Sequence, residues 1–423
     1  MVHHTMATST KSASKDSRTI QPMIRGYPRF ACVMLLLCIA GCATPPVAPP
    51  VAPPKAAPPP RAFATYKPVD WHDLPGWTDD DISAAWPAFR VGCNALVANP
   101  KTQSVWQTPC DEAVKLGPTP DRASVRAFFE AQFTAYRVLS SDGAETARVT
   151  GYYEPLLEGS LTRTERFSVP LYAPPDDLLT VDLGELYPEL KDKRVRGRLA
   201  GNRVIPYWAR GDIDAGLPAL DGKALVFVGD PVEAFFLEIQ GSGRIRLADG
   251  HVMRVGYADQ NGWPFRSIAR VLIDRGELSA DRASMQAIKA WGRAHPEQLP
   301  ALLAENPSYV FFRENPAPAA GTLEAQIDGP IGTLGVPLAA ERTIAVDPRA
   351  IPLGAPVFLA TTRPLSAEPL DRLVLAQDTG GAIRGALRVD YFWGFGDAAG
   401  REAGRMRQDG RLWLLWPKGT ALP

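Results

Sequence analysis

Residues 388–394 read RVDYFWG, and this stretch decides how the C-terminal part of the chain is interpreted. The alternation over 386–392 predicts a strand with Arg388, Asp390 and Phe392 on one face. Aspartate is an unfavourable strand residue, and its neighbours here are apolar and aromatic. Because such surroundings remove water from a carboxyl group, we expect the pKa of Asp390 to be raised toward the range of a general acid.

Two further aspartates end apolar runs nearby. Asp347 lies in 344–354 (IAVDPRAIPLG), and Asp378 lies in 377–385 (QDTGGAIRG). An aspartate before proline begins turns, and one before Thr-Gly-Gly accepts backbone N–H bonds in a loop. For Asp347 we favour this local role.

Helix and strand patterns divide the body of the chain into β-rich sections around a helical stretch. Apolar periodicity predicts helices at 79–92, 121–139, 266–276 and 281–294. Short β-branched and aromatic runs predict strands at 147–153, 171–172, 204–208, 224–228, 235–240, 357–359, 373–376, 387–392 and 412–416. This order favours two mixed β-rich domains over a doubly wound sheet.

The N-terminal segment 1–42 has the pattern of an export signal. Arg25 and Arg29 precede an apolar run over 30–39, which is too short to span a bilayer, where about 20 residues are needed. Residues 39–42 (IAGC) resemble a bacterial lipobox, which implies cleavage before Cys42 and lipidation of its thiol. The alternative is an ordinary secretory signal in which Cys42 has no role.

Prolines dominate the segment 43–64 that follows. Such a segment favours extended polyproline II at ~3 Å per residue, so we expect a tether between the anchor and the folded body. A proline-rich stretch is also a ligand for partner domains, but next to a lipid anchor the spacer interpretation is favoured.

Charge and cysteine content limit the partners of the mature chain. Five of the 46 Lys and Arg residues, but only one of the 46 Asp and Glu residues, precede Cys42. The remaining chain is slightly acidic and has no basic block, which argues against a nucleic-acid partner. Cys93 and Cys110 can pair in an oxidising compartment, stabilising the fold by roughly 3 kcal/mol. Without neighbouring histidines they are a poor zinc site, so we expect no metal.

The three aspartate segments resemble the three-aspartate domain that closes the membrane-bound lytic murein transglycosylase A family. Upstream, 150–155 (TGYYEP), 236–243 (FLEIQGSG) and 306–312 (NPSYVFF) resemble that family's blocks, in the same order. The resemblance covers residues 65–423.

This resemblance implies a mainly β fold with some α. A double-psi β-barrel domain would form from both chain ends, 65–155 and 323–423, with a second β-rich domain inserted over 156–322 and a groove for a glycan strand between them. It implies a cofactor-free enzyme with Asp390 as the catalytic aspartate and Asp378 and Asp347 as supporting members. We expect the groove to be lined by Thr150, Tyr152, Tyr153, Gln240, Gly241 and Ser242. For Asp397 two interpretations stay open, a further site residue or a solvated loop residue, and the loop is favoured.

A single carboxylate suffices for the implied reaction, whereas ordinary glycosidases pair two. The C6 hydroxyl of muramic acid attacks its own anomeric carbon, so positioning replaces the activation of a water molecule. The predicted partner is the glycan strand of peptidoglycan. Ala43 is not the aspartate associated with inner-membrane retention, so we expect the outer membrane, with the periplasm as the compartment. Membership of a cell-wall synthesis complex stays open.

Three other classes remain as alternatives. A hydrolytic two-carboxylate glycosidase would use Asp378 or Glu238 beside Asp390. An aspartic peptidase would use the Asp378-Thr379-Gly380 run, but the chain has no second such run, so that class needs a dimer. A non-catalytic glycan-binding lipoprotein would keep the fold without the reaction.

Overall fold

The computed structural model describes residues 63–187, 190, 195–280 and 282–423. The predicted signal, Cys42 and nearly all of the predicted tether lie outside the described residues. Within the described part, no helix combines the length and the apolar character needed to cross a membrane.

The helices and strands alternate irregularly along the chain. The helices are α1 (Trp86–Ala98), α2 (Gln103–Leu116), α3 (Arg122–Gln132), α4 (Arg210–Asp214), α5 (Pro231–Gln240), α6 (Ile268–Asp274), α7 (Met285–Ala294), α8 (Leu299–Ala304) and α9 (Gly396–Arg405), with short 3-10 turns η1 (Trp71–Asp73), η2 (Ile82–Ala85), η4 (Pro218–Leu220) and η5 (Glu324–Gln326). The strands are β1 (Ala64–Val69), β2 (Phe133–Ser140), β3 (Ala147–Glu154), β4 (Leu156–Ser160), β5 (Val169–Tyr172), β6 (Leu179–Thr180), β7 (Arg196–Ala200), β8 (Arg203–Pro206), β9 (Ala224–Val228), β10 (Ser242–Arg246), β11 (Val252–Gln260), β12 (Val310–Glu314), β13 (Thr343–Ala345), β14 (Pro356–Thr362), β15 (Pro369–Asp378), β16 (Arg388–Phe395) and β17 (Arg407–Pro417).

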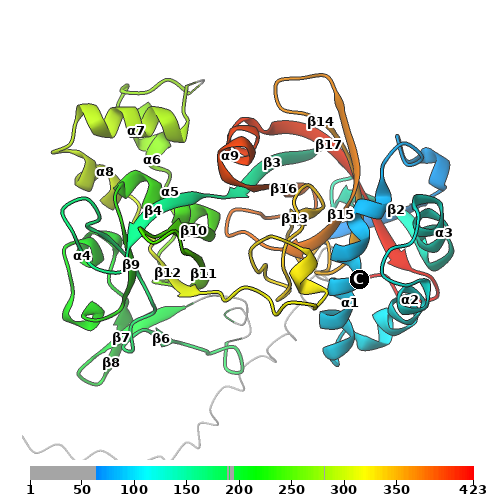
Figure 1. The fold of residues 1–423 in the computed structure, drawn as a ribbon, viewed down its shortest axis with the longest axis horizontal. Coiled ribbons are helices and arrows are strands. Elements are labelled where there is room, and N and C mark those ends of the chain that lie inside the picture. Colours follow the sequence, from blue (N-terminus) through cyan, green and yellow to red (C-terminus); the bar gives the residue numbers. More distant parts are fainter. Residues whose placement is uncertain (1–62, 188–189, 191–194, 281) are drawn as a thin grey trace, which may run out of the picture. The chain divides into compact units, whose positions relative to one another are not determined.

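Strands from both ends of the described chain share one eight-stranded sheet, in the order β1-β2-β17-β14-β15-β13-β16-β3. In Figure 1 these are the blue to teal and the orange to red strands. An additional pairing of β17 with β3 joins six of the strands in a continuous cycle. Trp106, Phe358 and Trp413 belong to the hydrophobic core of this region. The architecture is mixed α/β and β-rich, while the double-psi topology stays a prediction.

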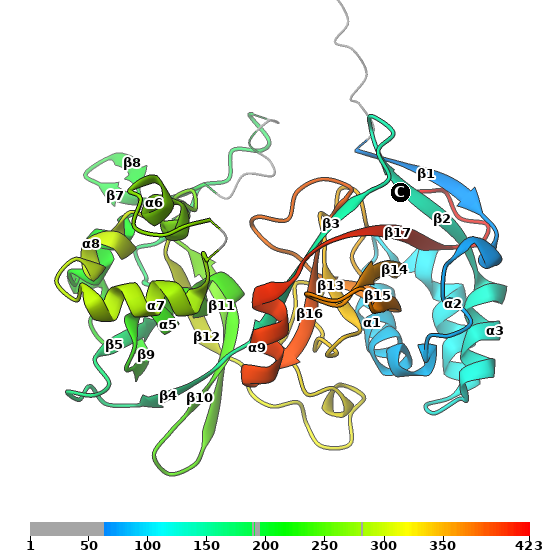
Figure 2. The same cartoon turned by 90° about the horizontal axis from the view of Figure 1, so that it is seen from above.

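The middle of the chain forms two other sheets. Six strands pair in the order β12-β11-β10-β4-β9-β5, and three pair as β6-β7-β8. Helices α4 to α8 belong to this region, as the green and yellow-green ribbons of Figure 2 show. Val226, Leu237 and Ile245 are buried in a core of their own. Each region therefore buries its own apolar residues.

Arg244 on β10 binds both segments in which the chain passes between the two regions. Its Nε donates to the buried carboxylate of Glu154 at 2.8 Å, at the end of β3. Its Nη2 donates to Asp328 at 2.9 Å, on the returning segment. The guanidinium also lies over the ring of Phe395, 3.9 Å from the ring centroid. These contacts fix the end of β3, which carries several predicted site residues.

Two predicted elements were wrong. Residues 235–240 belong to helix α5, not to a strand, because Asp230 accepts hydrogen bonds from the N–H groups of Val232 and Glu233 and nucleates the helix upstream. Gly241, at φ 78°, then ends it. The helix predicted over 121–139 stops at Gln132, and the rest of that range is β2, which pairs with β1 and β17.

Other boundaries moved and four helices were missed. In the range predicted as a helix over 79–92, the first part contains the 3-10 turn η2, and the α-helix α1 begins only at Trp86 and continues to Ala98. Helix α7 begins at Met285, later than predicted, because Ser284 provides its cap by accepting the N–H of Ala287. Helices α2, α4, α8 and α9 were not predicted. Helix α2 has Pro109 in its interior, α9 is rich in glycine, and α4 and α8 are only 5 and 6 residues long, so all four have weak local signals. The strands predicted at 147–153, 224–228, 373–376 and 412–416 are confirmed.

Candidate active site

Four neighbouring strands place Thr150, Asp390, Ala345 and Asp378 opposite one another. Asp390 on β16 pairs with Thr150 on β3 and with Ala345 on β13. Ala345 pairs in turn with Asp378 on β15. Directly paired residues of a sheet project to the same side. The four side chains therefore form one line on one face, here called the site row.

A bulge in β15 is what brings Asp378 into the site row. Ile344 pairs with Ala376, but Ala345 pairs with Asp378, so Gln377 is skipped. Gln377 is fully buried and donates to the carbonyl of Ala88 in α1. A bulge of this kind changes which side chain points to a given face. Without it Gln377 would stand opposite Ala345.

Asp390 is half-buried and has one specific hydrogen bond in the structure. The hydroxyl of Thr150 donates to its Oδ1 at 2.6 Å, and Nη1 of Arg388 donates to the Thr150 hydroxyl at 2.8 Å. Burial raises the pKa of Asp390 to about 6, and the charge of Asp378 acts in the same direction. The Thr150 bond and the charge of Arg388 oppose this shift. The direction predicted from the sequence is confirmed.

The apolar environment of Asp390 differs from the one expected. Among its sequence neighbours, Phe392 shares its face, while Val389 and Tyr391 are fully buried in the core on the opposite face. Water is excluded instead by a small cluster drawn from several elements, namely Tyr152, Leu338, Ala345, Ile383 and Phe392. The rings of Tyr152 and Phe392 lie 5.1 Å apart between centroids.

Asp378 is held by three donors. Its Oδ1 accepts bonds from the backbone N–H of Thr333 at 3.0 Å and from the Thr333 hydroxyl at 2.9 Å. Its Oδ2 accepts a bond from the hydroxyl of Tyr152 at 3.1 Å. Burial raises the pKa of Asp378, although these hydrogen bonds oppose the rise. Sequence reasoning missed Thr333, because nothing in the run around it distinguishes it from an ordinary loop residue.

Asp347 lies outside the site row and is fully engaged. Nε and Nη2 of Arg349 donate to its two carboxylate oxygens at 2.9 and 2.7 Å, and the N–H of Gly385 donates at 2.8 Å. Burial would raise its pKa, but these bonds outweigh burial and hold it at about 2. The contact with Gly385 fixes the end of the loop that follows Asp378. This agrees with the local role favoured for it from the sequence.

The remaining predicted residues meet where α5 passes into β10. Gln240 accepts the N–H of Tyr153 on its Oε1 at 3.1 Å, so this side chain joins the two regions. Gly241 provides the left-handed turn, and Ser242 is buried at the start of β10. Tyr153 is half-buried and packs on Gly400 of α9, where a Cβ atom would lie 2.8 Å from the ring.

Asp397 is exposed in the first turn of α9, so it is helical and not in a loop. Burial raises the pKa of Tyr153, and the charge of Asp397 acts in the same direction. A hollow of about 530 Å³, lined by residues between Pro264 and Pro307, contains none of the predicted site residues. The predicted glycan groove therefore stays a prediction.

Glu238 and the two cysteines considered in the sequence also have specific partners in the structure. Glu238, the alternative second carboxylate, is paired with Arg210 inside the middle region, with Nη1–Oε1 at 2.9 Å and Nη2–Oε2 at 2.6 Å. Glu238 therefore forms a buried ion pair and belongs to a different region of the chain from Asp390.

The two cysteines are paired as the sequence suggested: a disulfide joins Cys93 of α1 to Cys110 of α2.

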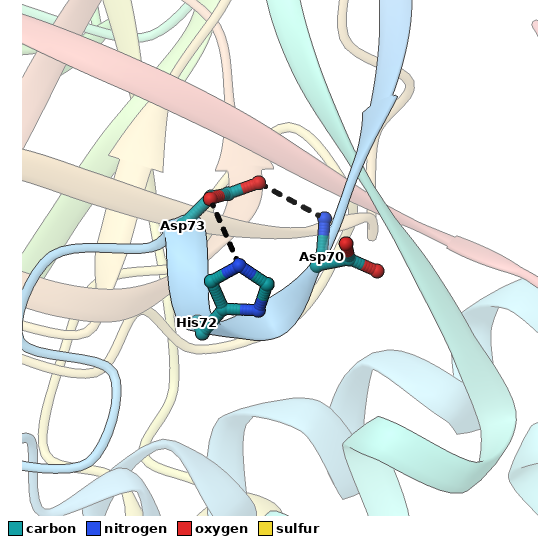
Figure 3. A group of neighbouring side chains, drawn as sticks. All are labelled: Asp70, His72 and Asp73. Carbon is teal, nitrogen blue, oxygen red and sulfur yellow. Dashed lines mark hydrogen bonds and ion pairs between the residues drawn. The ribbon is translucent and has the colours of Figure 1, made fainter.

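One group of side chains in the described part could bring three ligand atoms to a metal ion. It consists of Asp70, His72 and Asp73, at the turn after β1 (Figure 3). All three are exposed, and Asp73 already contacts Nε2 of His72 at 3.4 Å and the N–H of Asp70 at 3.3 Å. Exposed groups of this kind are common without an ion, and none of the three belongs to the site row.

Comparison with known proteins identifies the fold and the family. The family model of the MltA specific insert domain matches residues 148–313, and that of the 3D domain matches 342–416. The membrane-bound lytic murein transglycosylase A of Escherichia coli (strain K12) is 33% identical over 290 residues, which cover 66% of this chain and 68% of that protein.

Solved structures agree with these matches. The structure of MltA from Neisseria gonorrhoeae in its monoclinic form has 40% sequence identity and a TM-score of 0.73, covering 85% of this chain and 94% of that one. The structure of E. coli MltA with bound chitohexaose has 27% identity and a TM-score of 0.58, covering 84% and 91%. The chain therefore belongs to the membrane-bound lytic murein transglycosylase A family, whose members are enzymes that act on peptidoglycan.

Proposed function

We propose that this chain cleaves the β-1,4 bond between N-acetylmuramic acid and N-acetylglucosamine in peptidoglycan and leaves 1,6-anhydromuramoyl ends. Family membership supports a lytic transglycosylase. The observation that carries the finer proposal is Asp390: a half-buried carboxyl whose pKa is raised to about 6, with Oδ1 held by Thr150. Such a group is protonated on a useful fraction of molecules near neutral pH and can exchange that proton.

In the proposed reaction Asp390 acts twice. As an acid it gives its proton to the glycosidic oxygen while the bond from that oxygen to the muramic anomeric carbon breaks. As a carboxylate it then takes the proton of the C6 hydroxyl, whose oxygen bonds to the anomeric carbon. Protons balance and no water is consumed. The developing positive charge on the sugar is stabilised by carboxylate charge in the site row.

Asp378 supports Asp390 and does not act as a second acid or base. Two strand spacings separate the two residues, about 10 Å, a separation close to the 6.5–9.5 Å of inverting glycosidases. However, three donors occupy both oxygens of Asp378. Each of these donors makes Asp378 less basic, so the hydrolytic alternative is less well supported.

Product analysis tests this proposal. The purified full chain, in detergent, is incubated with sacculi, and soluble fragments are measured by mass spectrometry. We expect anhydro ends from the parent, none from Asp390→Asn, and parental products from Asp397→Asn, which removes an exposed carboxylate instead. Reducing ends would establish the hydrolytic alternative. Fragments released by Asp390→Asn at the parental rate would show that the acid is another group, and no release by the parent would indicate a non-catalytic glycan-binding protein.

The glycan substrate has separate support. The E. coli relative was crystallised with chitohexaose, a β-1,4-linked N-acetylglucosamine hexamer. We propose that this chain binds a strand of the same linkage along Thr150, Tyr152, Tyr153, Gln240, Gly241 and Ser242. We also propose that the six-strand cycle is a double-psi barrel built from 65–155 and 323–423, with 156–322 as the inserted domain.

The N-terminal sequence and the membrane-bound relatives support a location at a membrane. We propose that Cys42 carries the lipid, that residues 43–64 are the tether, and that the enzyme faces the periplasm from the outer membrane. Labelling with radioactive palmitate tests this: Cys42→Ala should lose the label and move to the soluble fraction. Label retained in that variant would refute the anchor. A partner in a cell-wall synthesis complex stays a prediction.

A further inference from the structure

Arg388 lies next to Asp390 on the same face of β16 and is connected to it through the hydroxyl of Thr150. Nη1 of Arg388 donates to the Thr150 hydroxyl at 2.8 Å, and also to the carbonyl of Val389 at 3.0 Å. The Thr150 hydroxyl donates to Oδ1 of Asp390 at 2.6 Å. The three side chains thus form a chain of donors that ends on the proposed acid.

The direction of this chain follows from the chemistry of its first member. A guanidinium donates hydrogen bonds and cannot accept them, whereas a hydroxyl has one proton and two lone pairs. Because Arg388 occupies a lone pair of the Thr150 hydroxyl, that hydroxyl must turn its proton elsewhere. Among the described residues the acceptor it meets is Oδ1 of Asp390.

We propose that Arg388 is a positioning residue: through Thr150 it keeps Oδ1 of Asp390 as an acceptor, so that the proton of the acid sits on Oδ2 and is delivered from there. The inference rests on the proposed function, since it concerns how Asp390 carries its proton. An oxygen that already accepts a short bond from a hydroxyl is a poor place for a second proton. Oδ2 is then the oxygen that meets the glycosidic bond.

The charge of Arg388 also acts on Asp390 directly, and the experiment must separate the two effects. The groups facing Asp390 are Arg388 on β16, Thr150 and Tyr152 on β3, and Asp378 on β15; Arg148 on β3 pairs with Arg388. A pure charge effect passes through space and persists whatever residue stands at position 150. An effect relayed by the hydroxyl disappears when the hydroxyl is removed.

A double-mutant cycle makes this separation. Arg388→Met, Thr150→Val and the double variant are compared with the parent full chain in kcat, KM and the pH at which activity is half lost. We expect Arg388→Met to lower kcat about tenfold in the parent and less than twofold when Thr150→Val is present, with little change in KM. Equal losses in both backgrounds would overturn the proposal.

Three controls sharpen the cycle. In the Thr150→Ser background, which keeps the hydroxyl, Arg388→Met should again cost about tenfold. Arg148→Met removes a neighbouring charge without removing a bond to Thr150, so its effect should be equal with and without Thr150→Val. Arg388→Lys keeps a donor and should recover part of kcat. Thermal unfolding of every variant shows that the fold is kept.

A second readout does not depend on turnover. Isotope-edited infrared spectra of the carboxyl groups, with Asp390→Asn subtracted, follow the titration of Asp390 itself. The pKa change caused by Arg388→Met should be larger with Thr150 present than with Thr150→Val; equal changes would overturn the inference. If the parent releases no anhydro products, the proposed function fails, while this titration still decides the role of Arg388.

Discussion

Two regions of the molecule surround their buried carboxyl groups with different hydrogen-bond donors. In the site row, Asp390 and Asp378 are held by hydroxyl and backbone donors, and burial raises the pKa of both. In the middle region, Glu238 forms a bidentate pair with Arg210, whose side chain is only 4% exposed. Arg210 also donates to the carbonyls of Asn306 and Ser308, so it fixes the segment that leads into β12.

The difference shows which carboxyl groups can react. A carboxylate paired with a guanidinium has its charge neutralised and its oxygens occupied, so it stabilises local structure. Burial raises the pKa of Glu238 as it raises that of Asp390, so the difference lies in the oxygens: those of Asp390 are not held by a guanidinium. Asp347, paired with Arg349, belongs with Glu238 in this respect, although it lies in the same C-terminal segment as Asp390.

The largest expected effect is on activity at Asp390. Asp390→Asn should lower the rate of glycan release about 10²–10⁴-fold, because it removes the proposed general acid and base. Thermal unfolding should not occur at a lower temperature than in the parent, since the change removes a desolvated acid without leaving a cation unpaired. A matched change in the other region, Glu238→Gln, should leave the catalytic rate of the folded protein near the parental one. A large loss of stability in Asp390→Asn would make this carboxyl a structural residue.

The second effect is on stability at Arg210. Arg210→Met leaves Glu238 buried without its partner and should lower the free energy of unfolding by about 3–5 kcal/mol. Urea unfolding followed by circular dichroism measures this change. Arg266→Met is the control, because its pair with Glu305 is exposed and is worth about 0–1 kcal/mol. Similar losses in the two variants would contradict the role assigned to the buried pair.

The third effect is a pair of opposite pH dependences. Asp390 binds its proton more tightly in the folded chain, with a pKa of about 6 against an ordinary 3.8, so its contribution to stability is lost as pH rises through that interval. Asp347, at about 2, contributes stability that is lost as pH falls from about 4 toward 2.

Calorimetric unfolding temperatures across pH check both signs. Asp390→Asn should flatten the curve between about pH 4 and 6, and Asp347→Asn should flatten it below about pH 4. In the parent, glycan release should decrease as pH rises above about 6, because the acid form of Asp390 disappears. Equal slopes for the parent and Asp390→Asn in the upper interval would remove the pKa argument for Asp390.

The smallest effect concerns Tyr152. Tyr152→Phe removes the hydroxyl bond to Asp378 and keeps the ring packing on Phe392, so we expect a few-fold loss of activity, equivalent to about 1 kcal/mol. Tyr391→Phe is the control: it also removes one hydroxyl bond, to the carbonyl of Glu341, but on the opposite face of the same sheet. Equal effects on activity in both variants would mean that Asp378 does not need this bond.

The sequence alone identified the chemistry around Asp390 and much of the strand content. Alternation placed Arg388, Asp390 and Phe392 on one face, and a carboxyl among apolar neighbours predicted the raised pKa. These inferences depend on local spacing, which the backbone imposes directly. The family blocks around 150–155, 236–243 and 306–312 indicated the reaction class by their order along the chain.

Only the tertiary structure decided how the site is assembled. The row from Thr150 to Asp378 depends on the pairing of Thr150 with Asp390, 240 positions later in the chain, and the bulge at Gln377 selects Asp378 as its last member. Local patterns also misassigned 235–240, where the cap at Asp230 lies outside the apolar run. Register, bulges and hydroxyl direction arise from long-range contacts, so a single sequence, read locally, contains the reactive groups but not the partners that tune them.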